Sequence, residues 1–338
     1  MAPRAARAEP PFGNQERNRW LRVVIAGPQV VCPPVPTIAY FGPRGTFTEQ
    51  AARGFDDAAE LVAYPTIPLA VAALRAGEAD FACVPVENSV EGSVSATMDA
   101  LAAGEPVVAV AEHVLPIRFS VLVRPGTAAA DVRTVASHPH ALAQVQRWLA
   151  EHLPGAQQVT AGSTAAAAVG VAEGAHDAAV TAPVAARHYP LAELATGVAD
   201  EGDALTRFLL LAKPGALPAP TGADRTSVFA VVAHRPGELA ALLTEFALRG
   251  VNLSRIESRP LRDRFGEYRF YLDLDGHVAE ARVGDALAAL HRRSQLVRFL
   301  GSYPRADRVG TAAPQAGTDT DFAESARWLA GLRQGEHA

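Results

Sequence analysis

Lysine is almost absent from this sequence: Lys213 is the only one, and arginine supplies the remaining positive side chains among 31 Lys and Arg residues. With 36 Asp and Glu residues, the formal net charge is −5 at pH 7. Affinity for phosphate backbones requires clustered Lys and Arg side chains, and this charge balance provides no overall positive field. We therefore expect no nucleic-acid partner.

Cysteine is equally scarce, with two residues, Cys32 and Cys83, in the whole chain. They form no C-x-x-C or other ligand-like spacing, so the sequence predicts neither a disulfide framework nor a zinc site. The histidines form no convincing ligand cluster, since His138 and His140 merely flank Pro139. We expect no metal ion, and a reducing cytoplasm is the default location.

Long hydrophobic runs are also missing. No stretch of 18 or more apolar residues free of charge and proline occurs, which argues against a membrane-spanning helix. The apolar run Val23–Cys32 follows several arginines and is superficially similar to a secretory signal, but Gly-Pro-Gln at 27–29 interrupts it and prolines follow. We interpret residues 1–36 as a disordered leader.

What the chain does contain is 49% hydrophobic residues, enough for the cores of two ordinary domains. From Thr37 onward, short apolar runs alternate with helical periods, which indicates an α/β sheet with ligands bound at the carboxyl ends of strands. The predicted strands are Thr37–Phe41, Asp80–Val84, Val107–Val110, Thr134–Ser137 and Ala178–Thr181. The predicted helices between them include Leu69–Leu74, Ala141–Leu149 and Ala165–Val171.

A second domain follows a stretch rich in Pro, Gly and Ala at residues 214–224, which is typical of a linker. The elements after it read strand, helix, strand, strand, helix, strand over residues 225–305, the βαββαβ order of a ferredoxin-like fold. Residues 306–338 form a polar tail in which only Phe322–Leu332 suggests a helix.

Hydroxyl side chains stand at three predicted helix starts in the first domain: Thr46, Ser137, and the pair Ser163 and Thr164. Each could simply cap its helix. Three helix N-termini that converge on a cleft would also suit an anion, in particular one with two carboxylates. The Gly-rich segment before Thr46 matches neither nucleotide-binding glycine motif, so a nucleotide cofactor is not indicated.

Two further polar segments border apolar strands. Pro85-Val86-Glu87-Asn88-Ser89 follows one strand and could contact a ligand or cap the next helix. Thr206-Arg207-Phe208 opens another strand after an acidic loop, where Arg207 could be no more than a solvated strand residue. Each segment is weak evidence by itself.

Taken together, these segments resemble the prephenate dehydratase family over nearly all of residues 37–305. The matching stretches are YFGPRGTFTEQAA at 40–52, PVENSVEGSV at 85–94, SHPHALAQ at 137–144, STAAAA at 163–168 and TRF at 206–208. The second domain is similar to the family's ACT regulatory module, with the ESRP motif at Glu257, Ser258, Arg259 and Pro260.

The resemblance implies an α/β fold: a two-lobed catalytic domain over residues 37–213, like a type II periplasmic binding protein, followed by the ACT domain over 225–305. The second lobe would span about 116–203. The implied activity converts prephenate to phenylpyruvate, CO2 and water without a cofactor. The implied catalytic residues are Thr206, Glu87, Asn88, Ser137 and Gln144. The implied substrate-binding residues are Thr46, Ser89, Ser163, Thr164, Arg207 and Phe208, where Arg207 either offsets substrate charge or braces its strand.

The same resemblance implies regulation by L-phenylalanine and a homodimer or homotetramer, since ACT modules usually pair side by side. The implied effector-binding residues are Gly237, Leu239, Asn252, Leu253, Glu257, Ser258, Arg259 and Pro260. Three positions depart from the commonest family pattern: His140, Asp203 and Glu238. An arogenate dehydratase, a prephenate decarboxylase or a non-catalytic small-molecule sensor remain alternatives, although Thr206 and the fused ACT domain favour the dehydratase.

Overall fold

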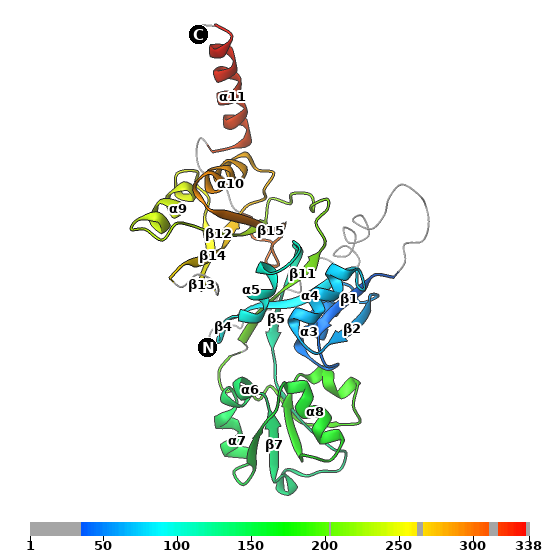
Figure 1. Cartoon of the computed structure of the whole chain (residues 1–338). Helices are drawn as coiled ribbons and strands as arrows, with labels where there is room; N and C mark the ends of the chain where they lie inside the picture. Colours follow the sequence, from blue (N-terminus) through cyan, green and yellow to red (C-terminus); the bar gives the residue numbers. More distant parts are fainter. Residues whose placement is uncertain (1–34, 203, 262–265, 311–316, 336–338) are drawn as a thin grey trace, which may run out of the picture.

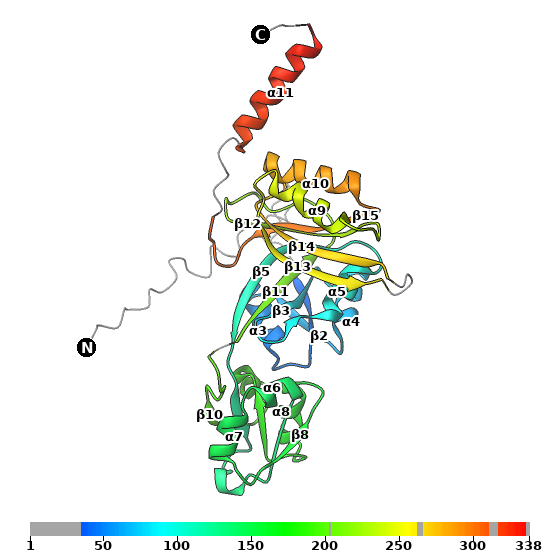
Figure 2. The same cartoon turned by 90° about the vertical axis from the view of Figure 1, so that its left-hand side faces the viewer.

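The computed structural model describes residues 35–202, 204–261, 266–310 and 317–335 (Figure 1). The leader predicted for residues 1–36 therefore lies almost wholly outside the described residues, as does Asp203. Three parts follow one another along the long axis of the molecule (Figure 2). They are a lower lobe, a central lobe and an upper domain that carries the last helix.

The central lobe is built on a mixed sheet whose parallel strands lie in the order β3-β1-β2 and whose antiparallel strand β11 lies between β3 and β5. Its strands are β1 (Thr37–Phe41), β2 (Glu60–Tyr64), β3 (Phe81–Asn88), β4 (Gly92–Ser93), β5 (Val108–Ile117) and β11 (Ala204–Ala212). Its helices are α3 (Phe47–Phe55), α4 (Ile67–Ala76) and α5 (Ser95–Ala102).

The two faces of this sheet bury different helices. Tyr40 and Phe208 pack with Phe55 of α3 in one hydrophobic cluster, whereas Leu74 of α4 and Met98 of α5 belong to a cluster on the other face. Successive strand residues point to opposite faces, so each strand of the sheet contributes to both clusters. The sheet is therefore covered on both sides, as the apolar strand sequences predict.

The lower lobe has its own five-stranded sheet in the order β10-β6-β9-β7-β8, and β5 and β11 connect it to the central lobe. Its strands are β6 (Ser120–Val123), β7 (Thr134–Ser137), β8 (Gln157–Thr160), β9 (Ala178–Thr181) and β10 (Ala192–Thr196). Its helices are α6 (Pro139–Ala143), α7 (Gln146–His152) and α8 (Thr164–Ala172), with short 3-10 helices at Ala129–Asp131 and Pro183–Arg187.

The prediction of one continuous helix over Ala141–Leu149 is wrong, because the chain breaks between α6 and α7. The Asp200 carboxylate accepts hydrogen bonds from the backbone N–H groups of Arg147 and Trp148 at 2.8 and 3.0 Å. The Asp200 N–H donates to the Gln144 carbonyl. A loop 53 residues beyond Arg147 thus caps the start of α7, and no pattern within the helix sequence indicates this contact.

The upper domain has the predicted βαββαβ order, and its strands pair as β13-β14-β12-β15. Its elements are β12 (Asp224–Val231), α9 (Glu238–Ala247), β13 (Leu253–Pro260), β14 (Tyr268–Asp275), α10 (Ala281–Arg293) and β15 (Leu296–Pro304). Strand β15 also pairs in parallel with β5 at Gly301 and Ala109, so the two domains share one ten-stranded sheet.

The tail forms helix α11 (Asp319–Arg333), which projects away from the upper domain (Figures 1 and 2). Its start is fixed by a capping box in which Thr318 and Asp321 exchange side-chain and backbone hydrogen bonds. None of its residues is buried. Within the described parts of the chain, no helix is long and apolar enough to cross a membrane.

Candidate active site

The polar segments picked out from the sequence meet at one edge of the central sheet. Strands β1 and β3 are parallel, so the chain leaving Phe41 toward Thr46 and the chain leaving Asn88 emerge at the same edge. Strand β11 runs in the opposite direction and begins there, with Thr206 in register with Asn88. Ligands of α/β sheets bind at such carboxyl edges, which makes this edge the candidate site.

Asn88 and Thr206 form the central contact of the site. The Asn88 side-chain amide donates to Thr206 Oγ1 at 2.8 Å, and Asn88 Oδ1 accepts from the backbone N–H groups of Val90 and Glu91 at 2.8 and 3.0 Å. Because Oδ1 is occupied by two donors, the NH₂ group must face Thr206. The threonine oxygen is therefore an acceptor in this pair, and its own proton is left for another acceptor.

Ser89 joins the two strands by a second pair of contacts. Its backbone N–H donates to the Leu205 carbonyl at 2.8 Å, and its hydroxyl accepts from the Leu205 N–H at 2.9 Å. These bonds fix the start of β11 against the end of β3. The geometry of Thr206 relative to Asn88 is thus set by the backbone on both sides of the pair.

The hydroxyls at the helix starts have defined local partners. Thr46 caps α3 by accepting from the Glu49 N–H and donates to the Phe41 carbonyl. Ser163 caps α8 by accepting from the Ala166 N–H at 2.9 Å, and Thr164 is the first residue of that helix. The capping interpretation of these two positions is confirmed, while carboxylate binding by them stays a prediction.

Ser137 differs from the other two positions. It ends β7, it is fully buried, and its hydroxyl donates to the Val180 carbonyl at 2.5 Å, while His138 is the N-cap of α6. Gln144 is the C-cap of α6. Ser137 thus joins two strands of the lower sheet, and the predicted catalytic roles of Ser137 and Gln144 remain predictions.

Contacts between the two lobes bring the ENSVEG and SHPH segments together. Glu91 lies 3.2 Å from His140 Nδ1, so the turn after Asn88 touches the start of α6. Glu49, which is 1% exposed, lies 2.8 Å from His188 Nε2, and the Tyr189 hydroxyl donates to the Arg44 carbonyl. No local pattern predicts the contact of Glu49 with His188, because 139 residues separate them.

The electrostatics at the start of α6 disfavour positive charge. Burial and the neighbouring His140 lower the pKa of His138 below its ordinary value, in opposition to the Glu91 carboxylate. His138 also accepts from the His140 N–H, a role that requires a neutral ring nitrogen. Because His138 is neutral, no positive side chain at this position repels the partial positive charge at the start of α6.

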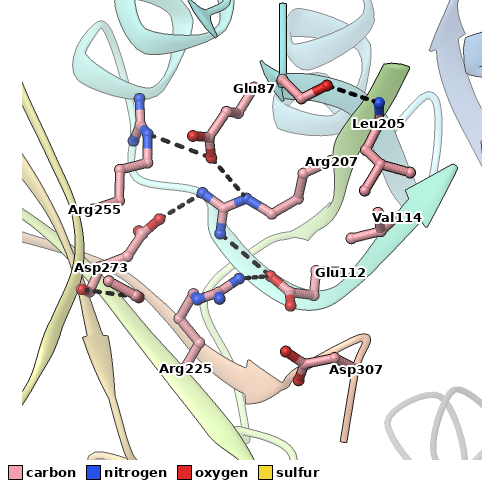
Figure 3. A pocket seen from close by; sticks show the side chains of 11 residues that line it. Glu87, Glu112, Val114, Leu205, Arg207, Arg225, Arg255, Asp273 and Asp307 are labelled. Atoms are coloured by element: carbon pink, nitrogen blue, oxygen red, sulfur yellow. Dashed lines mark hydrogen bonds and ion pairs between the residues drawn. The ribbon is translucent and has the colours of Figure 1, made fainter. Parts of the chain in front are cut away.

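Arg207 and Glu87 point into a pocket that is also lined by Arg225, Arg255 and Asp273 of the upper domain (Figure 3). The Arg207 guanidinium lies 3.2 Å from Glu112 and 2.5 Å from Asp273 of β14, and its Nε lies 3.6 Å from Glu87. Of the two alternatives for Arg207, these contacts support bracing of the strand. Phe208 is a buried member of the core.

The predicted effector residues on β13 alternate between the side of the strand that faces the catalytic domain and the exposed side. The Glu257 carboxylate accepts from the Ser93 hydroxyl, and Arg259 donates to Ser95, so both face the catalytic domain. Ser258 and Pro260 are exposed. Asn252 donates to Asp275 at 2.7 Å, Leu253 is half-buried, Gly237 is the N-cap of α9 with φ 84°, and Leu239 is 36% exposed.

The fold and site together define a class: a two-lobed α/β domain with a polar edge between its lobes, joined to an ACT domain. Residues 38–216 match the prephenate dehydratase family, and residues 226–292 match the ACT domain. The chain belongs to the prephenate dehydratase family.

Named relatives agree with this assignment. A prephenate dehydratase of Amycolatopsis methanolica is 62% identical over 303 residues, covering 89% of this chain and 99% of the relative. One of Mycobacterium tuberculosis is 49% identical over 309 residues, covering 88% and 94%. The crystal structure of the Arthrobacter aurescens prephenate dehydratase in complex with L-Phe superposes with a TM-score of 0.84 at 44% identity, covering 88% and 99%.

A further solved structure is described as a quorum-quenching acylase, GqqA. It superposes with a TM-score of 0.73 at 31% identity, covering 79% of this chain and 97% of the other. The fold thus accompanies a second described activity, and an activity assay is needed to separate the two.

Proposed function

We propose that this chain converts prephenate to phenylpyruvate, CO2 and water, and that L-phenylalanine regulates this reaction through the ACT domain. The observation that carries the proposal is the Asn88–Thr206 hydrogen bond at the candidate edge, in a chain of this family. Because Thr206 accepts this hydrogen bond, its own hydroxyl proton stays available for donation, and Thr206 is the threonine of the TRF motif.

The reaction requires help mainly for the departing hydroxyl group. The bond between the ring and its carboxylate breaks, the electron pair enters the ring, and the C–O bond to the ring hydroxyl breaks as the ring becomes aromatic. We assign Thr206 as the general acid that donates a proton to the leaving oxygen. The Asn88 amide would then stabilise the negative charge that develops on the threonine oxygen, and water would restore the proton.

Substrate binding would use the hydroxyl and backbone donors at the helix starts. Prephenate carries two carboxylates, and the first turns of α3 and α8 present N–H groups beside Thr46, Ser163 and Thr164. These neutral donors can hold carboxylates without a metal ion or a nucleotide. We include the remaining predicted residues of the edge, Ser89, Ser137 and Gln144, in the same hypothesis.

Regulation and assembly form the second half of the proposal. L-phenylalanine is the proposed effector because a relative with 44% identity was crystallised with L-Phe. The proposed effector surface includes the exposed residues of β13 and the start of α9. We further propose a homo-oligomer formed through ACT domains and a cytoplasmic location, which is consistent with the buried free thiol of Cys83.

The test is product analysis with purified protein. The chain is incubated separately with prephenate and with arogenate, and phenylpyruvate and phenylalanine are measured with and without added L-Phe. We expect phenylpyruvate from prephenate and a changed rate with L-Phe. Product from arogenate alone would make the chain an arogenate dehydratase, and binding without turnover would favour the sensor. An N-acyl homoserine lactone in a parallel reaction tests the acylase activity described for GqqA.

A further inference from the structure

Charged side chains, of which Glu112, Arg207 and Asp273 are buried, line a cavity of about 230 Å³ between the catalytic domain and the ACT domain (Figure 3). Glutamates and an arginine come from β3, β5 and β11 of the catalytic sheet, and arginines and an aspartate come from the ACT strands. We call these side chains the interdomain charge cluster: Glu87, Glu112, Arg207, Arg225, Arg255 and Asp273.

Arg207 and Asp273 form a buried ion pair that crosses the boundary between the two domains. The exposed fraction is 8% for Arg207 and 4% for Asp273, and their closest atoms are 2.5 Å apart. Burial raises the pKa of Asp273, but Arg207 and Arg255 outweigh the burial and hold this pKa below its ordinary value. A buried charge without a partner is strongly unfavourable, so this ion pair holds the two domains against each other, while Glu112 gives Arg207 a second partner within the catalytic domain.

Asp273 is itself fixed inside the ACT domain. Ser227 of β12 donates to Asp273 Oδ1 at 2.6 Å, and the Ser227 oxygen lies 2.7 Å from the hydroxyl of Tyr303 on β15. Three strands of the ACT sheet therefore determine where the Asp273 carboxylate lies. Its second oxygen bonds Arg207, so the ACT core fixes one partner of the guanidinium, and Glu112 of β5 provides another.

Arg207 is the immediate neighbour of Thr206 on β11. Successive strand residues point to opposite faces, so the side chain of Arg207 enters the cluster while that of Thr206 meets Asn88. The pairing of β11 with β3 shifts register between Arg207 and Phe208, a bulge on that side of the strand, while the pairing with β5 stays regular through this stretch. The partners of Arg207 therefore act on β11 directly beside Thr206, next to the bulge.

We propose that Asp273 of the ACT domain is a positioning residue for the reaction, acting through Arg207 to hold Thr206 against Asn88. This inference rests on the proposed function of Thr206. It makes the ACT domain a part of the structure that builds the catalytic edge, in addition to its role in effector binding. A misplacement of a catalytic group by about 1 Å can cost on the order of 100-fold in rate.

The test compares two isosteric changes on the same strand, without effector. Asp273→Asn removes the ACT-domain charge that pairs with Arg207 and leaves the contact with Glu112 in place. The control Asp275→Asn removes another buried carboxylate, 4% exposed, whose partners Arg305 and Asn252 lie within the ACT domain. We expect Asp273→Asn to lower kcat at least about tenfold with KM within about twofold, and Asp275→Asn to keep kcat within about twofold.

The readouts separate positioning from stability and from the proposed function. Both variants are assayed well below their unfolding temperatures, so a merely structural role would leave kcat unchanged. Unchanged kcat in Asp273→Asn, or equal losses in both variants, would overturn the inference. If wild-type protein fails to convert prephenate, the proposed function fails instead.

If Asp273→Asn does not fold, Ser227→Ala takes its place. This change keeps the Asp273 charge and removes the hydroxyl that donates to Asp273 Oδ1, the oxygen that does not bond Arg207. We expect a smaller loss of kcat, about threefold or more, again with KM nearly constant. A wild-type kcat in Ser227→Ala would then refute the positioning role.

Discussion

Gly301 is the residue at which the two domains become one sheet, and replacing it with alanine should separate them. It has φ 131°, and its backbone pairs with Ala109 of β5. A Cβ atom at this position would lie 2.2 Å from the Ala109 carbonyl oxygen and 2.8 Å from its nitrogen. Both contacts are with backbone, so no side-chain rotation can relieve them.

Two costs add up in Gly301→Ala. An L-residue with side chain in this backbone region costs on the order of 1–3 kcal/mol. Forcing the extra methyl group against a packed backbone costs about another 1–3 kcal/mol. We therefore expect the free energy of unfolding to fall by roughly 2–6 kcal/mol, which lowers the unfolding temperature by at least about 4 °C.

The assay is thermal unfolding of Gly301→Ala beside a matched control. Gly284→Ala lies inside α10, where the nearest atom outside the helix to the new Cβ would be the Val278 carbonyl oxygen at 3.4 Å. Alanine in a helix interior is favoured over glycine by about 0.5–1 kcal/mol, so the control should unfold at or above the wild-type temperature. A Gly301→Ala protein as stable as wild type would refute the account of the shared sheet.

Three further predictions concern single groups. Asn88→Asp keeps an acceptor for the Val90 and Glu91 N–H groups but replaces the donor to Thr206 with an acceptor, so kcat should fall by about 10- to 100-fold in a steady-state assay. The pKa of His138 is lowered in the folded protein, so the unfolded chain binds the proton more tightly, and the free energy of unfolding should decrease as the pH falls below the ordinary histidine range. Denaturant titrations at several pH values should show a weaker dependence of this free energy on pH in His138→Asn. Burial raises the pKa of the Cys83 thiol, so peptide mass spectrometry should find it alkylated only after denaturation, and rapid alkylation of the native protein would contradict its placement.

Local patterns predicted much of the fold. The alternation of apolar runs predicted the α/β class, and the second domain has the predicted βαββαβ order. Leu242 and Phe246, four residues apart on α9, are buried in the ACT core, as the helical period requires. The tail helix was also predicted, although α11 is longer than the apolar segment because Thr318 and Asp321 start it earlier.

Long-range contacts explain what local patterns missed. Asp200 interrupts the helix predicted over 141–149, and it does so from a distant loop. The partners of Arg207, Glu112 and Asp273, are 95 and 66 residues away in sequence, so nothing near the TRF motif indicates that its arginine faces another domain. The inward hydrogen bond of Ser137 to Val180 is likewise invisible in the SHPH segment.

The most direct test of the central claim is the turnover number of Thr206→Val with prephenate. Valine has nearly the shape of threonine and lacks only the hydroxyl, so binding and folding should be preserved while the proposed proton donor is lost. We expect kcat to fall by about 100- to 10,000-fold with KM little changed, and Thr206→Ser, which keeps a hydroxyl, to retain much more activity. A Thr206→Val protein with the wild-type kcat would contradict the assignment of Thr206 as the general acid.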